Sequence, residues 1–529
     1  MTPRGFWLLL LFALAAGTPA CSSPRAKAGD IEVLLRVDGA DQRIAIPAGS
    51  TVQQALDLVG LQLGALDRVE PPPYTLLSDG TVLSINRVLE RFEVETLVVP
   101  FERQTIRNEA LPAGESRLLQ SGENGEQEIT YRVLVESHGE VSRTPIKTVL
   151  VREPRPEITM LGAQQAFAPV TMEGRLAYLS GGNAWIMQET SANRRPITLS
   201  ADLDGRVFRL SPDGEWLLFS RQAAPDSSEI NSLWVVQVAE PLEDPLPLGV
   251  ENVVHFADWS PNISASSRYV IAFTTVEPRS SPPGWQANND LSALTLSNAG
   301  AVVSRQIVLD SNAGGQYGWW GSSFLWSPAG DTLAYARADA VGWLSVGDGQ
   351  SVPLLELIPF EPPGDWAWVP GLAWSSDGAT IYFVNHTFLP GASSPERSPV
   401  FDLTAIHPTS GLLLPLVERT GMFANPSVPS AELGSTNTGL LAFYQALDPF
   451  DSEKSHYSIA VADRDGSNRR ILFPPAGELG LQPNRLVWSP DGTLIAASYR
   501  EDLWIIDVNS GHAERLTSDG NVIAYDWKP

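Results

Sequence analysis

Six large aromatic residues lie in long insertions between short apolar segments, and their ring type points to ligand stacking. They are Trp285, Tyr317, Trp319, Trp320, Trp366 and Trp368, and Phe388 lies in an insertion of the same kind. Rigid rings carried on loops can stack on saccharide rings or grip a peptide, so the first six are candidate ligand contacts. Alternatively, any of these rings could fill space between neighbouring units of the repeat described below.

Residue types that catalyse reactions are present, but their spacing matches no catalytic motif. The chain has no Gly-x-Ser-x-Gly sequence, which the nucleophile elbow of an α/β-hydrolase needs. The segment Asp463-Arg464-Asp465-Gly466 resembles the start of a calcium loop but lacks the later glutamate, so we expect a hairpin turn. The histidines show no metal-ligand spacing: His138, His255, His386, His407, His456 and His512. We therefore assign no catalytic residue, metal ligand or cofactor.

One turn sequence recurs along the C-terminal part of the chain and must position these loops. Its copies are Leu210-Ser211-Pro212-Asp213-Gly214, Trp259-Ser260-Pro261-Asn262, Trp326-Ser327-Pro328-Ala329-Gly330, Trp374-Ser375-Ser376-Asp377-Gly378 and Trp488-Ser489-Pro490-Asp491-Gly492. Proline presets φ, Asp bonds the turn backbone and Gly accepts the left-handed exit. Because apolar strand-like segments flank each turn, each copy predicts a β-hairpin.

The spacing of these turns predicts a β-propeller. Counting the third turn residue gives seven repeat markers: Pro212, Pro261, Pro328, Ser376, Pro426, Pro490 and Pro529. Their spacing fits the roughly 40–50 residues of propeller repeats once loops are allowed for. The first unit lacks its innermost strand and the chain ends in a lone strand at 522–529, so the two would close a ring. We therefore predict a seven-bladed propeller over residues 174–529, which resembles TolB-type and WD40-like repeats.

In such a propeller the long insertions would share one face, opposite the recurring turns. The insertions cover residues 222–232, 276–290, 310–323, 359–371 and 385–400. Loops on a rigid scaffold commonly carry binding sites. The tryptophans that precede the turns would lie in innermost strands and pack between blades: Trp259, Trp326, Trp374 and Trp488.

The N-terminus has the pattern of a secretory signal. Arg4 precedes a short apolar run from Phe6 to Ala16, which is too short to span a bilayer, so residues 1–20 are predicted to be a signal peptide. Cys21 is the single cysteine and follows Ala20. This arrangement resembles the lipobox of bacterial lipoproteins, which implies lipidation of Cys21 and attachment to a membrane. Ordinary cleavage near Ala20 is the alternative. Residues 21–29 form a polar tether.

Residues 30–92 predict a small β-grasp domain. Alternating apolar residues from Ile31 to Val37 and from Arg43 to Ile46 flank a turn, and Thr51 can cap a short helix. Two further strand-like segments meet near Ser78-Asp79-Gly80. The order resembles the ubiquitin-like module that precedes G5 domains in cell-wall proteins of the YabE and resuscitation-promoting-factor type.

Residues 93–162 resemble a G5 domain, named for five glycines. These correspond here to Gly114, Gly122, Gly125, Gly139 and Gly162, around a strand with alternating faces at 128–135. The resemblance implies an extracellular wall or adhesion protein and binding to N-acetylglucosamine-containing glycans. A spacer without a ligand is the alternative. Residues 163–173 would link this domain to the propeller.

Composition narrows the function classes. The chain of 529 residues has a formal net charge of −25, with 36 Lys and Arg against 61 Asp and Glu. A nucleic-acid partner is not expected, because phosphate binding needs clustered basic residues. The sequence thus predicts an all-β-dominated, lipid-anchored, extracytoplasmic protein that binds wall glycan or an envelope protein without catalysis. The alternative is a glycan hydrolase or lyase with a carboxylate pair in the propeller channel.

Overall fold

The computed structural model describes residues 29–529 except for 109–110, 112–113, 137–138, 163–167, 264–267, 390, 392–393, 431–436 and 519. The predicted signal peptide, Cys21 and all but the last residue of the tether lie outside the described residues. Within the described part, no helix combines the length and apolar character needed to cross a membrane. The chain divides into two compact units, Met1–Thr105 with Leu118–Thr159, and Ile106–Arg117 with Met160–Pro529.

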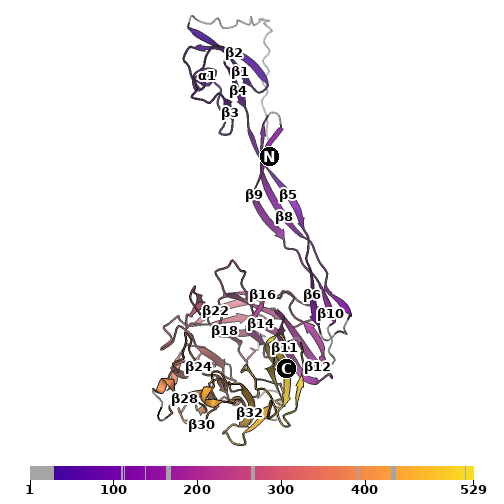
Figure 1. Ribbon diagram of the computed structural model, residues 1–529, viewed down its shortest axis with the longest axis vertical. Helices are drawn as coiled ribbons and strands as arrows, with labels where there is room; N and C mark the ends of the chain where they lie inside the picture. Colours follow the sequence, from indigo (N-terminus) through magenta and orange to yellow (C-terminus); the bar gives the residue numbers. More distant parts are fainter. Residues whose placement is uncertain are drawn as a thin grey trace, which may run out of the picture. The chain divides into compact units, whose positions relative to one another are not determined.

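The first domain of the chain has the predicted β-grasp order (Figure 1). Its elements are β1 (Asp30–Val37), β2 (Ala40–Pro47), α1 (Val52–Leu58), β3 (Arg68–Glu70) and β4 (Val82–Asn86), in the sheet order β2-β1-β4-β3. Thr51 caps α1 through a reciprocal capping box with Gln54. The buried helix residues Val52 and Leu56 join the same hydrophobic cluster as Leu35 on β1. The helix therefore covers the sheet through the face that the sequence pattern indicated.

The next part of the chain forms two three-stranded sheets. One has the order β5-β8-β9, with β5 (Leu89–Val99), β8 (Gly125–Glu136) and β9 (Gly139–Arg152). The other has the order β6-β10-β7, with β6 (Arg103–Asn108), β7 (Ser116–Gln120) and β10 (Glu157–Gly162). The boundary predicted between residues 92 and 93 falls inside β5. In the β5-β8-β9 sheet Val133 is fully buried, whereas Phe92 and Val98 are largely exposed. This sheet depends on cross-strand pairs more than on a core.

Two of the five glycines are explained by close packing. A Cβ on Gly122 would lie 2.3 Å from the ring of Phe101, and one on Gly125 would lie 2.5 Å from the carbonyl oxygen of Arg152. Any larger residue would displace these neighbours.

The rest of the chain folds into consecutive antiparallel sheets. We number the seven main sheets of the described residues in chain order. The first contains β11 (Thr171–Ser180), β12 (Asn183–Pro196) and β38 (Val522–Lys528); the second, β13 (Leu203–Leu210), β14 (Trp216–Gln222), β15 (Asn231–Gln237) and β16 (Leu246–Glu251); the third, β17 (Ala257–Trp259), β18 (Tyr269–Phe273), β21 (Leu291–Leu296) and β22 (Val302–Leu309). A separate hairpin of β19 (Val276–Pro278) and β20 (Trp285–Ala287) lies in the loop between β18 and β21.

Four more sheets repeat this pattern. The fourth contains β23 (Ser323–Trp326), β24 (Thr332–Arg337), β25 (Ala340–Ser345) and β26 (Ser351–Glu356); the fifth, β27 (Leu372–Trp374), β28 (Ile381–Thr387), β29 (Val400–Ile406) and β30 (Leu413–Val417); the sixth, β31 (Leu440–Ala446), β32 (Tyr457–Asp463) and β33 (Arg470–Phe473); the seventh, β34 (Val487–Trp488), β35 (Leu494–Tyr499), β36 (Asp502–Asp507) and β37 (Ala513–Arg515). Short 3-10 helices, η1 (Pro395–Arg397) and η3 (Pro449–Asp451), lie in loops.

The two ends of this region pair as the sequence predicted. β38, at the C-terminus, is antiparallel to β11, with Leu176 opposite Trp527 and Tyr178 opposite Tyr525. Figure 1 shows the yellow terminal strand beside the magenta β11 and β12. The terminal strand therefore completes the first sheet.

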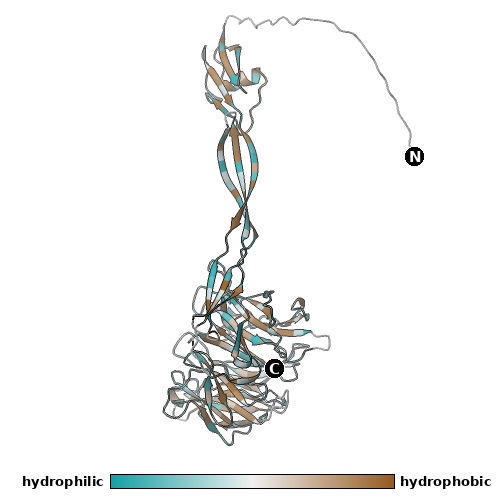
Figure 2. Ribbon diagram, turned by 90° about the vertical axis from the view of Figure 1, so that its right-hand side faces the viewer, coloured by the Kyte–Doolittle hydropathy of each residue, from teal (hydrophilic) through white to brown (hydrophobic). Residues whose placement is uncertain are grey.

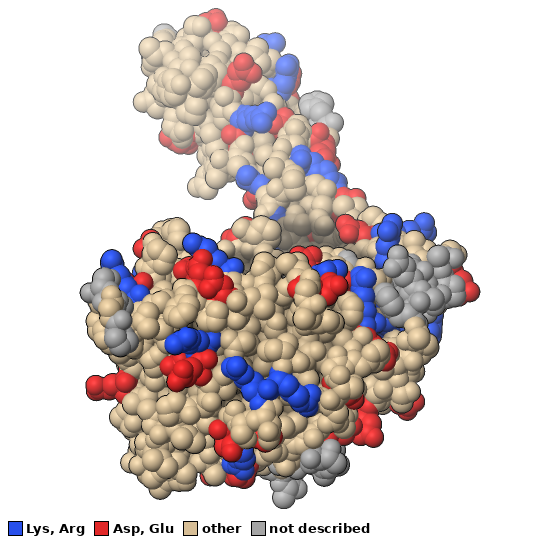
Figure 3. Space-filling view, turned by 60° about the horizontal axis from the view of Figure 1, so that its bottom comes forward, with Lys and Arg blue, Asp and Glu red and all other residues tan. Residues whose placement is uncertain are grey.

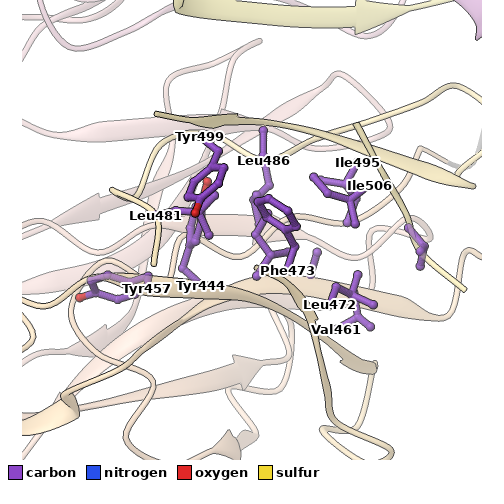
Figure 4. Packing of buried hydrophobic residues seen from close by; sticks show 14 of the residues in the cluster. Tyr444, Tyr457, Val461, Leu472, Phe473, Leu481, Leu486, Ile495, Tyr499 and Ile506 are labelled. Carbon is purple, nitrogen blue, oxygen red and sulfur yellow. The ribbon is translucent and has the colours of Figure 1, made fainter. Parts of the chain in front are cut away.

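Apolar residues fill the spaces between successive sheets. Between the sixth and seventh, buried Tyr444, Phe473, Ile495 and Ile506 belong to one cluster, and Figure 4 shows side chains from the two sheets facing each other. Similar clusters join the first to the second and the second to the third sheet. Burial between sheets is therefore what stabilises the repeat.

The recurring turns have the hydrogen bonds that their residues suggested. The Ser211 hydroxyl donates to Asp213 at 2.6 Å and accepts from the backbone N–H of Trp216 at 2.9 Å. Ser489 and Asp491 repeat the first contact at 2.5 Å. The turns therefore hold the first two strands of a sheet together.

Candidate functional site

The structure separates the six candidate rings into buried and accessible ones. Trp285, on β20, is 7% exposed, and Trp368 is 2% exposed. Both rings therefore pack in the interior. Tyr317, Trp319, Trp320 and Trp366 are partly exposed, and for these four a role in ligand contact stays a prediction.

Three of the candidate tryptophans meet in one place together with a histidine. We call His255, Trp285, Trp319 and Trp320 the tryptophan cluster. The ring of His255 lies 4.5 Å from that of Trp285, edge to face, and Trp285 lies 5.1 Å from Trp320. Trp319 and Trp320 lie 5.5 Å apart at 84°. The buried Trp285 thus supports Trp320, which in turn contacts Trp319.

The loop that carries Trp319 and Trp320 is fixed by the preceding insertion. Asn289 is 7% exposed and donates through its amide to the carbonyl oxygens of Gly318 (2.8 Å) and Asn312 (3.3 Å). Asn312 returns a hydrogen bond to the carbonyl oxygen of Asn289 at 2.8 Å. The N–H of Ala287 also donates to the carbonyl oxygen of Trp319 at 3.0 Å. These contacts hold the two exposed rings in one arrangement before any ligand arrives.

A basic residue lies near the tryptophan cluster. Arg206 belongs to β13, within the stretch between Leu203 and Phe208 where the pairing with β14 shifts register. Burial and, to a lesser degree, the charge of Arg206 lower the pKa of His255 to about 4. His255 is therefore a neutral ring at physiological pH.

The second aromatic group is interior packing in the fifth sheet. Trp368 lies 4.9 Å from Phe401, which stacks on His386 at 4.8 Å. The indole N–H of Trp368 donates to the carbonyl oxygen of Met422 at 3.0 Å, and both ring nitrogens of His386 contact backbone carbonyl oxygens. Trp366 lies at the edge of this group, 6.0 Å from Phe360. Only Trp366 of these residues is a candidate for contact with a ligand.

Two aspartates, on β38 and β17, form ion pairs with arginines. Asp526, on β38, is 1% exposed, accepts from the N–H of Leu210 at 2.9 Å and lies 3.3 Å from Arg485. Asp258 lies 3.6 Å from Arg209. Burial lowers the pKa of Arg209, as does neighbouring Arg485. In the described part of the chain, no group of three or more His, Cys, Asp and Glu side chains could hold a metal ion.

The β5-β8-β9 sheet offers two accessible faces. On one, Arg143 lies over the ring of Tyr131 at 4.4 Å and pairs with Glu93 and Glu95 at 2.8 and 3.1 Å. On the other, alternation places Phe92, Val94 and Val98, which are 61%, 62% and 65% exposed. Figure 2 shows hydrophilic and hydrophobic colour alternating along these strands. The sheet therefore exposes apolar contact area beside charged pairs.

Charge is mixed on the surface. Figure 3 shows acidic and basic side chains interspersed over the face in view, with wide uncharged areas between them. A continuous field of one sign, such as polyanion binding requires, does not cover that face.

Sequence reasoning missed Arg206, His255 and Asn289 as neighbours of the tryptophans. His255 lies 30 residues before Trp285 in the numbering and was one of six scattered histidines. The loop lengths gave no indication that Trp285 would form a hairpin strand. The one available signal was Asp204-Gly205-Arg206, a polar stretch with glycine at the beginning of a strand.

Two family models match the N-terminal part of the chain. Residues 90–164 match the family described as "G5 domain", and residues 33–73 match "G5-linked-Ubiquitin-like domain". The resuscitation-promoting factor Rpf2 of Corynebacterium glutamicum is 28% identical over 146 residues, which are 28% of this chain. The match spans 39% of the length of Rpf2.

Solved structures resemble separate parts of the chain. The G5 structure of HP0197 is 18% identical, with a TM-score of 0.14, and aligns over 14% of this chain and 99% of its own. The β-propeller domain of the trilobed protease from Pyrococcus furiosus is 12% identical, with a TM-score of 0.36, and aligns over 77% of this chain and 97% of its own. A prolyl endopeptidase is 13% identical, with a TM-score of 0.44, and aligns over 66% of this chain and 49% of its own. The chain thus contains a G5 domain, preceded by a G5-linked ubiquitin-like domain.

Proposed function

We propose that this protein is a bacterial cell-surface protein that binds cell-wall glycan containing N-acetylglucosamine through its G5 domain. The match of residues 90–164 to the G5 family carries the proposal. The alignment with a resuscitation-promoting factor over 146 residues supports an extracellular setting.

The apolar face of the β5-β8-β9 sheet supports a contact with sugar rings. Phe92, Val94 and Val98 are exposed along one strand, and ion pairs such as Arg152 with Glu126 (3.2 Å) lie on the neighbouring strands. Apolar surface flanked by hydrogen-bonding groups suits a saccharide, which presents both C–H faces and hydroxyls.

Retention on purified peptidoglycan tests this proposal. The full chain should sediment with insoluble peptidoglycan, and Phe92→Ser should reduce the retained fraction severalfold. Ile523→Ser removes a residue of similar exposure, 54%, from the C-terminal strand and should leave retention unchanged. Failure of the unmodified chain to sediment would refute the glycan proposal.

We also infer that the seven sheets form a closed propeller whose loop rings bind a protein or a glycan. The pairing of β38 with β11 and the clusters between successive sheets support a ring. The accessible rings are Tyr317, Trp319, Trp320 and Trp366. Removal of residues 522–529, which contain β38, should leave a protein that unfolds at lower temperature and loses such binding.

A lipid anchor at Cys21 completes the proposal. The position of Cys21 after a short apolar run supports it. In a bacterial host, the protein should incorporate labelled palmitate and fractionate with membranes, and Cys21→Ser should abolish both. Unchanged labelling of Cys21→Ser would exclude the anchor.

A further inference from the structure

Three segments that begin successive sheets converge on the tryptophan cluster. Arg206 lies near the start of β13, His255 lies two residues before β17, and Trp320 lies three residues before β23. β13 and β17 lie side by side, because Arg209 lies 3.6 Å from Asp258 and its carbonyl oxygen accepts a hydrogen bond from the indole N–H of Trp259. Arg206 and His255 each lie three residues before the Arg209–Asp258 pair in the sequence, and the ring of His255 contacts Trp285, which contacts Trp320. The lowering of the His255 pKa by the charge of Arg206 agrees with this placement. The site therefore combines stacking surface with a positive charge.

Arg206 has donors available for a ligand. Its side chain is 39% exposed, and its Nε lies 3.8 Å from a carboxylate oxygen of Asp204, too far for a strong hydrogen bond. Asp204 itself is already used, because it accepts from the hydroxyl of Ser220, from Asn231 at 2.9 Å and from the backbone of Arg206 at 3.0 Å. A guanidinium whose N–H donors are not taken up by a close carboxylate favours a planar anion that can accept two hydrogen bonds.

The aromatic side of the site is rigid. Asn289 and Ala287 fix the loop that carries Trp319 and Trp320, and a Cβ on Gly321 would lie only 2.8 Å from the ring of His255. The rings and the base of the loop are therefore close-packed. Stacking on such preorganised rings costs little conformational entropy.

We propose that the tryptophan cluster and Arg206 together bind a saccharide that carries a carboxylate. The sugar ring stacks on Trp319 or Trp320, and the carboxylate pairs with Arg206. The neutral state of His255 adds no second charge, so the site distinguishes an acidic sugar from a neutral one through a single guanidinium. This inference rests on the proposed binding of glycan by the loop rings and specifies the class of sugar.

The test compares two ligands that differ in one charge. The acidic ligand is a β-1,4-linked disaccharide of N-acetylglucosamine in which one sugar carries a lactyl carboxylate, and the neutral ligand is its methyl ester. Calorimetric titration of the full chain should give about tenfold tighter binding of the acid, as expected for one charge-assisted hydrogen bond. Arg206→Gln should abolish this preference, and Trp319→Ala should lower the affinity for both ligands.

The control is Arg500→Gln, which removes an equal charge from a loop of the seventh sheet where Arg500 pairs with Glu478 at 3.4 Å. It should preserve the preference for the acid. Equal affinity for acid and ester, or a preference that persists in Arg206→Gln, would overturn the inference while leaving glycan binding intact. If the chain binds neither ligand, both this inference and the proposed glycan binding by the loop rings would be overturned. The effect of Phe92→Ser on retention by peptidoglycan tests the G5 domain separately.

Discussion

The indole N–H of Trp326 donates to the backbone carbonyl oxygen of Asp258 in the preceding sheet, at 3.3 Å. Trp259 makes the equivalent contact with Arg209 at 3.0 Å, and Trp374 with Leu325 at 3.2 Å. Each recurring tryptophan therefore both fills the space between two sheets and ties their first strands together. Trp488 departs from this pattern, because its buried indole nitrogen has no hydrogen-bond partner among the described residues.

This difference predicts unequal costs for the same substitution. Trp326→Phe removes the hydrogen bond to the carbonyl oxygen of Asp258, whereas Trp488→Phe removes a donor that has no acceptor among the described residues. Both lose similar ring area, so Trp326→Phe should lower the free energy of unfolding by about 1 kcal/mol more than Trp488→Phe. Denaturant titration of both variants measures the difference. Equal losses would mean that the indole hydrogen bond contributes nothing.

The absence of an acceptor for Trp488 also marks where the sequence pattern was weakest. Asn425-Pro426-Ser427 is the turn marker without tryptophan, and the sixth sheet has only an isolated bridge, between Ser427 and Ala442, in place of a full first strand. Local turn chemistry therefore predicted the hairpins well, because proline, aspartate and glycine act within one turn. The pairing of the chain ends was also predictable, because the first unit lacked one strand and the chain ended in a strand without partners.

The candidate site could be predicted only in part. Loop length identified the segment with Trp319 and Trp320, but it could not distinguish them from Trp285 and Trp368, which tertiary packing buries. His255 and Gly321 are 66 residues apart in the numbering, yet a Cβ on Gly321 would lie 2.8 Å from the ring of His255. Their proximity results from how sheets stack, which is a long-range property that no local pattern encodes.

The ion pair between Asp526 and Arg485 should stabilise closure of the first sheet on the seventh. Asp526→Asn keeps an acceptor for the N–H of Leu210 but leaves Arg485 without its counter-charge. We expect a loss on the order of 2 kcal/mol in the free energy of unfolding. The measurement is thermal and denaturant unfolding of the full chain.

Arg485→Met provides the other arm of a double-mutant cycle. It should also be destabilising, because it removes the ion-pair partner of the buried carboxylate of Asp526. The double variant should lose clearly less than the sum of the two single losses. Additive losses would show that the pair, despite its 3.3 Å separation, makes no energetic contribution.

The contact between Gly122 and Phe101 predicts a compensating pair in the G5 domain. Gly122→Ala places a methyl group 2.3 Å from the ring of Phe101, so it should destabilise this part of the fold by about 1–3 kcal/mol. Combining it with Phe101→Leu should recover part of that loss. Hydrogen exchange of β8 amides reports the local effect, and Gly439→Ala, where an added methyl meets open space, is the control. No change in Gly122→Ala would contradict the packing.

The buried imidazole of His255 should make stability depend on pH in a definite direction. Burial and, to a lesser degree, the charge of Arg206 lower its pKa from 6.5 to about 4, so between these pH values the unfolded chain binds a proton that the folded protein does not. Stability should therefore fall as the pH drops from about 6.5 to about 4, by up to about 3 kcal/mol from this group. His255→Phe keeps an aromatic ring beside Trp285 and removes the titration. Relative to this variant, the wild type should lose free energy of unfolding over that pH range, while His512→Phe, at a site with a 71% exposed side chain, should follow the wild type. A constant difference between wild type and His255→Phe from pH 7 to pH 4 would show that His255 titrates as it does in the unfolded chain.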